Sequence, residues 1–446
     1  MSFPVRADIL VRCGGMLLCV AVGGCLTPAH LKSEVADIKS QVEDVKSAVQ
    51  ISKSNADAAQ DAAQAAEEAA VSAQSTANEA LASAKASNAC CEGINEKTDR
   101  MLKRATPETA TTGPVRKTVY YATNRNQGDT SKPKRAYGTN RAQLSYGRCE
   151  VSIPSTHVEG QIEEPPWWKF WAQENPSEHV ILLHVYPSAD KASFFDLLRE
   201  AFPRSAPKRA AFVFIPGFSV SFEDAAKRTA QMAADLKFDG VPIFFSWPSK
   251  DHISVRDYLA DETSARASES VVTTFLDDFM TQTNAEQVYL IAHSLGTDVL
   301  TQAFMKLVAV NPKMRRRVRE VILAAPDIDA EIFKNDVAPV LLGSGNARTP
   351  LTLYASSTDK ALATSHEAHK APRAGEIGQG LVLLNGVETI DASNVDTSFL
   401  NHSPFDSRAV ISDISVLIDT GQRACNRFGL EKIIQGPMGV YCSIRP

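Results

Sequence analysis

The sequence predicts an α/β domain with a mainly parallel β-sheet, preceded by a long N-terminal α-helical coiled coil. Three observations support this prediction. A heptad pattern of apolar and small residues begins at Leu31 and runs without a slip to Met101. A short polar segment, TPETATTGP, follows from Thr106 to Pro114. Beyond it, apolar stretches of strand length alternate with helical patterns, which is typical of a parallel sheet covered by helices on both faces.

Residues 1–24 are expected to be a signal peptide rather than part of the fold. Arg6 and Arg12 form its basic start, and the apolar run from Cys13 to Gly24 is only about a dozen residues long. A bilayer-spanning helix needs roughly 20 residues, so this run is typical of a signal sequence instead. The run ends in VGGC, which resembles a bacterial lipobox and implies a lipidated Cys25. Ordinary cleavage after a nearby small residue and an uncleaved anchor are the alternatives.

The residue after the lipobox cysteine bears on location. It is Leu26, where an aspartate would be the usual signal for retention in the inner membrane. The resemblance therefore implies a lipid anchor in the outer membrane, facing the periplasm.

Loss of the signal and lipidation of Cys25 would leave five of the eight cysteines, namely Cys90, Cys91, Cys149, Cys425 and Cys442. An odd number in an oxidising compartment indicates a free thiol or a bond between chains. Cys425 and Cys442 flank the last short segment and could close it.

Residues 25–104 are predicted to form an alanine-rich stalk. Its heptad positions are β-branched at the start and alanine from Ala56 to Ala84. A spacing of 3.5 residues held this long imposes a left-handed supercoil, and the rod would be roughly 100 Å long. Each alanine layer buries little area, so many layers are needed. Cys91 occupies a heptad position and Cys90 flanks it, so neighbouring chains could be cross-linked there.

The stalk sequence, with ANEALASAKASN and NEKTDRMLKR, resembles the murein lipoproteins of the outer membrane. Their alanine zippers are trimeric, so the resemblance implies a homotrimer. Those proteins end in a lysine that is attached to peptidoglycan. Here the chain continues past Lys103 into the predicted linker, residues 105–117, which puts attachment to the wall in doubt.

Residues 118–446 are predicted to form the α/β domain. The expected strands are Thr118–Ala122, Glu150–Ile153, Val180–Tyr186, Ala211–Ile215, Val241–Phe245, Gln287–Ala292, Arg319–Ala325, Leu351–Ala355 and Gly386–Ile390. The expected helices are Phe222–Asp235, Glu262–Thr281, Asp298–Val308 and Ser407–Asp419. The segment EPPWWKFWA holds Trp167, Trp168 and Trp171, which we interpret as a packed flap, with a substrate lid or a lipid-facing edge as alternatives.

Ser294 is the candidate nucleophile. It lies between an expected strand and an expected helix, in Ala292-His293-Ser294-Leu295-Gly296. A serine on so tight a turn needs small residues two places before and after it, because the turn brings backbones together. This pattern is typical of a nucleophile elbow, with alanine in place of the first glycine. His293 is interpreted as structural, because its side chain should point away from that of the serine.

A hydrolase of this kind also needs an oxyanion hole, an acid and a base, with the acid and base following the serine in that order. The backbone N–H groups of Phe218, after Gly217, and of Leu295 are the oxyanion candidates. Asp359 is the preferred acid. Asp327 is a second possible acid, and Asp329 is interpreted as a helix cap. His402 is the preferred base. His366 and His369, which are expected in a polar loop, are the other histidines that follow Asp359.

The motifs FIPGFSVSFEDAAKR, FFSWPS, LIAHSLGTDVL, ILAAPDID, LYASSTDKAL and GVETIDAS with NHSPF resemble a family of bacterial alpha/beta hydrolases of uncharacterised substrate. YYATNR and LSYGRCEVSIP match its N-terminal part, and the resemblance covers about residues 117–420. It implies an alpha/beta-hydrolase fold with Ser294, Asp359 and His402 as the triad. Two departures are Pro216 in place of the usual histidine before the glycine, and Leu295 in place of the usual methionine or similar residue after the serine.

The sequence thus predicts a membrane-anchored serine hydrolase, carboxylesterase- or lipase-like, that acts on a small-molecule or lipid ester through an acyl-enzyme. Amide and thioester substrates fit the same residues. No cofactor or metal is expected, and a net charge of −5 without a basic bias argues against a nucleic-acid partner. The competing hypothesis is a non-catalytic envelope spacer or binding protein on a hydrolase fold, which the intact set of triad candidates disfavours.

Overall fold

The computed structural model describes residues 32, 35–47, 49–50, 53, 113–165, 173–203, 208–250, 255–345, 348–395, 403–434 and 439–445. The chain divides into two compact units, Met1–Ala110 and Thr111–Pro446. Cys25, Cys90, Cys91, the alanine layers and the three clustered tryptophans lie outside the described residues.

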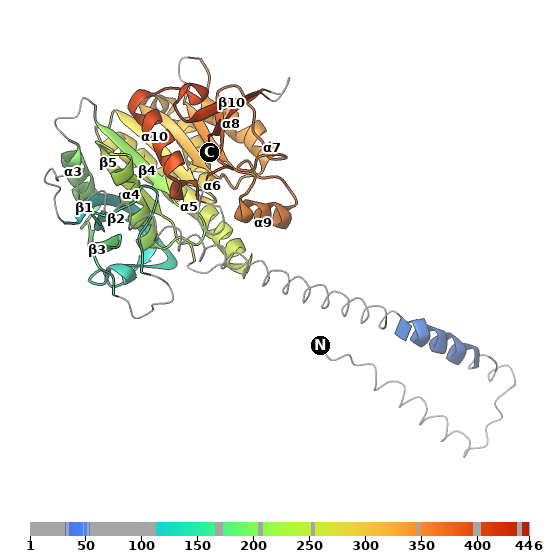
Figure 1. The fold of residues 1–446 in the computed structure, drawn as a ribbon. Coiled ribbons are helices and arrows are strands. Elements are labelled where there is room, and N and C mark those ends of the chain that lie inside the picture. The colour runs from blue at the N-terminus through green and yellow to red at the C-terminus, as the bar shows by residue number, and fades with distance from the viewer. Residues whose placement is uncertain are drawn as a thin grey trace, which may run out of the picture. The chain divides into compact units, whose positions relative to one another are not determined.

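The described part of the first unit is helical, over residues 35–47 and 49–50 (Figure 1). Its apolar heptad side chains are between 47% and 62% exposed; they are Val35, Ile38, Val42, Val45 and Val49. The predicted N-terminal helix is therefore present, with its apolar positions uncovered in a single chain.

The second unit is built on one twisted sheet (Figure 1). Among the described residues the sheet has eleven strands in the order β10-β11-β9-β8-β7-β6-β4-β5-β1-β2-β3. Their bounds are β1 Val115–Gln127, β2 Tyr137–Ile153, β3 Ile181–Pro187, β4 Ala210–Ile215, β5 Val241–Ser246, β6 Gln287–His293, β7 Val318–Ala324, β8 Leu351–Ala355, β9 Val387–Asp391, β10 Leu430–Ile434 and β11 Val440–Ile444. Strands β1, β5, β4, β6, β7, β8, β9 and β11 pair in parallel in that order, and antiparallel pairs lie at both ends. The predicted mainly parallel sheet is confirmed.

Helices cover both faces of this sheet. The helices are α3 Lys191–Ala201, α4 Phe222–Asp235, α5 Val255–Gln282, α6 Gly296–Val310, α7 Ala330–Ile332, α8 Ala338–Leu342, α9 Lys360–His369 and α10 Arg408–Thr420. Short 3₁₀ segments are Pro133–Arg135, Pro312–Arg317, Pro404–Asp406 and Ala424–Asn426, and Phe333–Val337 forms a π-helical turn. One buried cluster joins α3, α5, α6 and α8 to one face, and a second joins α4 and α10 to the other.

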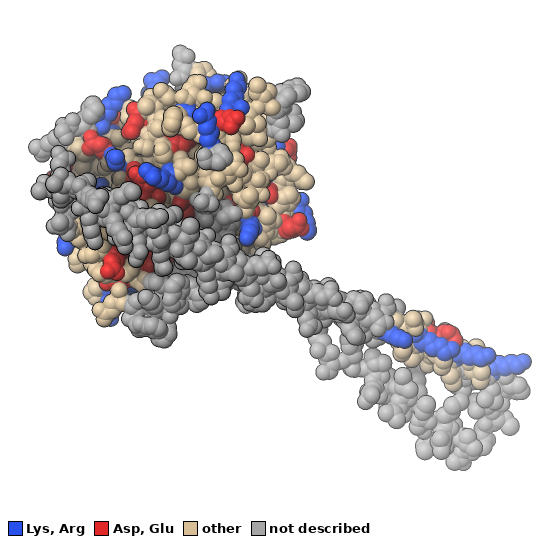
Figure 2. Space-filling model, in the orientation of Figure 1, with Lys and Arg blue, Asp and Glu red and all other residues tan. Residues whose placement is uncertain are grey.

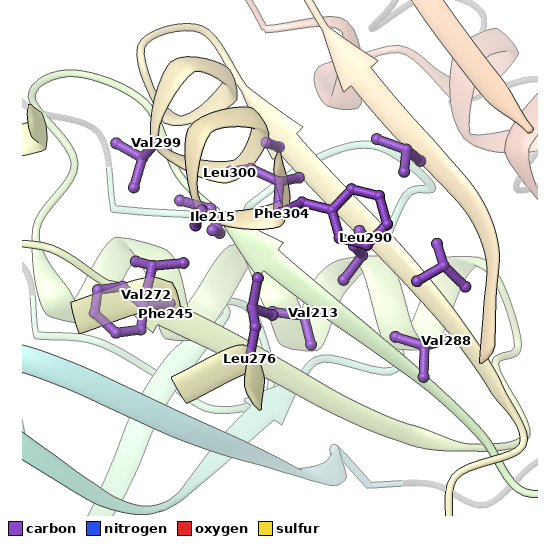
Figure 3. Packing of buried hydrophobic residues seen from close by; sticks show 14 of the residues in the cluster. Val213, Ile215, Phe245, Val272, Leu276, Val288, Leu290, Val299, Leu300 and Phe304 are labelled. Atoms are coloured by element: carbon purple, nitrogen blue, oxygen red, sulfur yellow. The ribbon is translucent and has the colours of Figure 1, made fainter. Parts of the chain in front are cut away.

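The larger cluster fills the space between the central strands and two long helices. Figure 3 shows side chains of β4, β5 and β6 meeting those of α5 and α6. The labelled residues are Val213, Ile215, Phe245, Val288 and Leu290 from the strands, and Val272, Leu276, Val299, Leu300 and Phe304 from the helices. Side chains alternate between the two faces along each strand, so a central strand must be apolar throughout. This is why these strands were visible in the sequence as continuous apolar runs.

Two features of the fold correct the expectations. The strand expected at Glu150–Ile153 begins much earlier, at Tyr137. Its first half was missed because most of the residues there are polar or small and only partly buried or exposed, so they give no apolar pattern. The placement of His366 and His369 in a loop was wrong, since both lie in α9. This helix buries only Leu362 and Ser365, so it has no wide apolar stripe from which its period could be recognised.

The end of the chain forms a hairpin, β10–β11, at one edge of the sheet. Cys425 is disulfide-bonded to Cys442, as the sequence suggested, and the bond closes this hairpin onto the segment before it. Cys149 is a free thiol and is buried.

None of the described helices is long and apolar enough to span a membrane. In Figure 2, basic and acidic side chains are interspersed on the visible face rather than gathered by sign.

Candidate active site

Ser294 lies on a strained turn between β6 and α6. Its φ is 51°, in the left-handed region that non-glycine residues rarely adopt. Its N–H donates to Ala324 O at 2.9 Å, and its carbonyl accepts from Thr297 N at 2.9 Å and Thr297 Oγ1 at 2.6 Å. The neighbouring strand and the first turn of the helix thus fix the backbone on both sides of the serine. This is the geometry of a nucleophile elbow.

Glycines on two segments make the elbow possible. A Cβ on Gly296 would lie 2.3 Å from Pro216 O and 2.6 Å from Ile215 O. A Cβ on Gly217 would lie 2.8 Å from the Cβ of Ser294. The end of β4 and the residues that follow it therefore lie close to both Ser294 and the start of α6. The sequence argument that small residues are needed because backbones approach one another is confirmed at Gly296.

The loop after β4 carries the first oxyanion candidate. Phe218 is partly buried, and its ring packs edge-on against Tyr258 at 5.5 Å between centroids. Leu295 caps the N-terminus of α6. Within the described parts of the chain, no protein acceptor is found for the backbone N–H of Phe218 or of Leu295. Both donors belong to segments that adjoin Ser294.

Trp247 fixes the start of the same loop. The residue is fully buried. Its Nε1 donates to Pro216 O at 2.8 Å, directly before Gly217.

The two candidate acids have different surroundings. Asp359 follows β8, is 4% exposed and caps α9, where its Oδ1 accepts from Leu362 N at 2.9 Å. Asp327 follows β7, and both of its oxygens accept from side chains. The donors to Asp327 are Tyr258 OH at 2.6 Å, Ser365 Oγ at 2.7 Å and Arg373 Nε at 2.7 Å. The carboxylate of Asp327 is thus committed to a local network. Asp329 caps α7, as expected.

His402 lies outside the described residues, which resume at Ser403. The segment after it is held by contacts that the sequence did not reveal. Phe405 is buried in the core, and Arg228 of α4 donates to Phe405 O at 3.2 Å and also pairs with Asp406. The ring of His293 packs edge-on against Phe405 at 6.1 Å, which fits its interpretation as a structural residue.

The sheet brings these segments to one edge. His293 pairs with Ala324, Ala324 with Tyr354, and Ala355 with Asp391, all in parallel register. The residues that follow β6, β7, β8 and β9 therefore leave the same carboxyl edge, where ligands bind in open α/β sheets. Ser294, Asp359 and the segment leading to His402 leave this edge in the chain order that an alpha/beta hydrolase requires.

Asp298, a titratable residue, lies about one helical turn beyond Ser294. Burial raises the pKa of Asp298 to about 6, the charge of Glu269 adds to the rise, and Arg266 opposes it. Burial likewise raises the pKa of Tyr258, so its hydroxyl stays protonated and donates to Asp327. Among the described residues, no group of three or more His, Cys, Asp or Glu side chains is placed to hold a metal ion.

A family model described as an alpha/beta hydrolase of unknown function (DUF900) matches residues 191–420, which is more than half of the chain. The chain belongs to this family. A second family model, the alanine zipper of the major outer membrane lipoprotein, matches residues 33–106. The family of the second unit and the likeness of the stalk to a lipoprotein zipper, both expected from the motifs, are confirmed.

Solved structures give weaker similarities. An uncharacterized protein from Bacillus cereus ATCC 10987 is 12% identical at a TM-score of 0.31, over 50% of this chain and 63% of that one, so the chain spans less than two thirds of that protein. A putative cell surface hydrolase from Lactobacillus plantarum WCFS1 is 11% identical at 0.29, over 48% and 92%. EstE1, a thermophilic carboxylesterase cloned from a metagenomic library, is 10% identical at 0.29, over 72% and 94%. No curated protein matches. The assignment rests on the family model alone.

Proposed function

We propose that this chain is a serine hydrolase that cleaves carboxylic esters through an acyl-enzyme, with Ser294 as nucleophile, Asp359 as acid and His402 as base. The single observation that carries the proposal is the strained turn at Ser294. This turn lies at the carboxyl edge of the sheet, in close contact with Gly217. A non-glycine residue in the left-handed region costs roughly 1–2 kcal/mol. Such strain is concentrated at functional sites.

The reaction follows from the order of these groups. His402 takes the proton of Ser294 Oγ as the oxygen attacks the ester carbonyl. Asp359 fixes the tautomer of the imidazole and stabilises its charged form. The N–H groups of Phe218 and Leu295 bind the oxyanion, and each such donor is worth about 3–4 kcal/mol. The tetrahedral intermediate then breaks its bond to the alcohol oxygen, which receives the proton from His402, and the acyl-enzyme remains. Water attacks the acyl-enzyme with His402 again as base, and the carboxylic acid leaves as Ser294 regains its proton.

Asp359 is preferred to Asp327 because of the side chains that surround the carboxylate of Asp327. Three side chains already donate to Asp327, one of them the guanidinium of Arg373. A histidine would have to share the carboxylate with these three donors, which already stabilise its charge. Asp359 follows β8, the strand next to β9 in the sheet, and its Oδ1 accepts from the backbone N–H of Leu362.

The sequence of the stalk supports a location of this protein in the cell envelope. We propose that Cys25 carries lipid, that the anchor lies in the outer membrane, and that three chains associate through the heptad positions. The support is the match to a lipoprotein alanine zipper and the exposure of the apolar positions in a single helix. Small-molecule and lipid esters both suit an enzyme so placed.

A fluorophosphonate probe tests the nucleophile. The full chain should be labelled and should hydrolyse p-nitrophenyl esters of some chain length. Ser294→Ala should abolish labelling and lower kcat by on the order of 10⁶. Ser270→Ala, at an exposed position of α5, is the matched control and should change neither. Equal labelling of wild type and Ser294→Ala, or no labelling of a folded wild type, would favour the non-catalytic spacer instead.

A further inference from the structure

Arg125 is a buried cation beside the candidate oxyanion loop. Strand β1 pairs in parallel with β5 as far as Thr123 and Ser246, so Arg125 lies just past the last pair, at the carboxyl edge of the sheet. The residue is 1% exposed. A guanidinium this deeply buried is costly unless its N–H groups find acceptors. The acceptors it finds show what it holds in place.

The guanidinium joins the loops that follow β4 and β5. Its Nη2 donates to Val220 O at 2.7 Å, in the loop after β4. Its Nε donates to Ser246 Oγ at 2.8 Å and its Nη1 to Ser249 O at 3.1 Å, at the end of β5 and just after it. Nη1 also donates to Gly138 O in β2 at 3.1 Å. One side chain thus ties together three segments of the sheet edge.

Asp261 of α5 supplies the opposite charge and is fully buried. Its carboxylate accepts from Lys250 N at 2.8 Å and from Ser249 Oγ. Burial raises the pKa of Asp261, while hydrogen bonds from Ser249, from the backbones of Lys250 and Ser219, and the charge of Arg125 oppose that rise. The aspartate therefore binds the same two loops as the arginine, through their donors rather than their acceptors.

The loop of residues 216–221 has a strained backbone that depends on contacts with its neighbours. Ser219 has a φ of 55°, in the left-handed region, although it is not a glycine. Trp247 holds Pro216 O, Asp261 interacts with the backbone N–H of Ser219, and Arg125 holds Val220 O. Phe218 lies between these three anchor points. Contacts on both sides of Phe218 thus set the direction of its backbone N–H before any substrate arrives.

We propose that Arg125 is a positioning residue, which together with Asp261 fixes the loop 216–221 so that Phe218 N–H points at the oxyanion. This rests on the proposed function. Donors that are preorganised in this way stabilise developing charge without reorganising during the reaction. An arginine is needed because its planar fork reaches acceptors in several directions, whereas the single ammonium of lysine cannot.

The test compares Arg125→Lys with wild type in the full chain. The loop should lose its hold on Val220 O, so kcat should fall about 10²-fold while KM changes less than about threefold, as for loss of one oxyanion donor. The affinity for a trifluoromethyl ketone, which forms a charged tetrahedral adduct, should fall in parallel with kcat/KM. A purely structural role would lower the active fraction and leave both constants of the remaining enzyme unchanged.

Arg141→Lys is the matched control, because Arg141 lies opposite Arg125 in β2 and is exposed. It should behave as wild type. A folded Arg125→Lys with kcat within twofold of wild type would overturn the proposal. If Arg125→Lys does not fold, Asp261→Asn replaces it and should lower kcat about tenfold, and an unchanged kcat would again overturn it. Full activity in Ser294→Ala would refute the proposed function instead, so the two failures are distinguishable.

Discussion

Valine side chains are about half exposed in the described helix of the first unit of this chain and buried in the central strands of the second. Val42 and Val45 of the N-terminal helix are 47% and 52% exposed, whereas Val213 and Val288 of the sheet are fully buried. A strand between two layers of helices buries both faces within one chain. In the described residues of the N-terminal helix, the apolar heptad side chains stay about half exposed. The second unit therefore completes its core within one chain, whereas the exposure of the stalk positions supports the proposed association of chains.

If the hydrolase unit is complete in one chain, its acid comes from the same sheet edge as its nucleophile. Asp359→Asn should lower kcat by about 10⁴, the loss seen when a triad aspartate no longer fixes the imidazole tautomer. Asp327→Asn should instead mainly lower stability, because it disturbs the bonds to Tyr258 and Arg373. Ester hydrolysis and thermal unfolding of both variants measure this. The reverse ranking of the two kcat values would make Asp327 the acid.

If three chains associate through the stalk, disrupting its heptad positions should lower the mass of the particle in solution threefold. In the full chain, Val42→Asp combined with Val45→Asp should convert a trimer into a monomer, because each charge would be buried at the seam between helices. Sedimentation equilibrium measures the mass. Activity per chain should stay the same, since no triad candidate lies in the stalk. Ser40→Asp, at a position off the heptad seam, is the control and should remain trimeric. A wild type that is already monomeric would contradict the assembly.

Valine truncation compares the units directly. Within the hydrolase unit, residues 113–446, Val288→Ala removes methyl groups from a filled core and should cost about 2 kcal/mol at any protein concentration. Val115→Ala, at a position that is half exposed, should cost less than about 0.5 kcal/mol. In the full chain, the effect of Val45→Ala on stalk melting should depend on protein concentration, because burial there requires association. Urea unfolding and concentration-dependent thermal melts distinguish the two kinds of burial.

The smallest expected effect is a pH dependence confined to the hydrolase unit. His157 Nδ1 lies 2.8 Å from Glu163 Oε2 and His157 Nε2 lies 2.7 Å from Asp235 Oδ1. Burial alone would lower the pKa of His157, but the bonds to Asp235 and Glu163 outweigh it and raise the pKa above 6.5. The stabilisation is therefore complete below pH 6.5 and is lost as pH rises through the raised value.

Urea unfolding of wild type and His157→Gln measures this. The difference between them should shrink by on the order of 1 kcal/mol from pH 5.5 to pH 9. The heptad segment of the stalk, residues 31–104, contains no histidine, so its melting should not change across this window. A difference that grows with pH would show that His157 is neutral in the folded protein.

The sequence by itself determined those features of the fold that depend on residues close together in the chain. The heptad spacing indicated the stalk, and continuous apolar runs indicated the central strands. A serine flanked by small residues, between a strand and a helix, indicated the elbow at Ser294. Each of these signals is carried by residues within a few positions of one another, because strand and helix periods and tight turns are local constraints.

What only the tertiary structure decided depends on contacts between distant segments. Arg125 is bound to Val220, which is 95 residues away along the chain, and to Ser249, which is 124 residues away. Asp327 and Asp359 both followed expected strands, and only the side chains that surround Asp327 separate them. No local period encodes which loops meet at the carboxyl edge. The strand order sets these meetings, and it exists only once the sheet has formed.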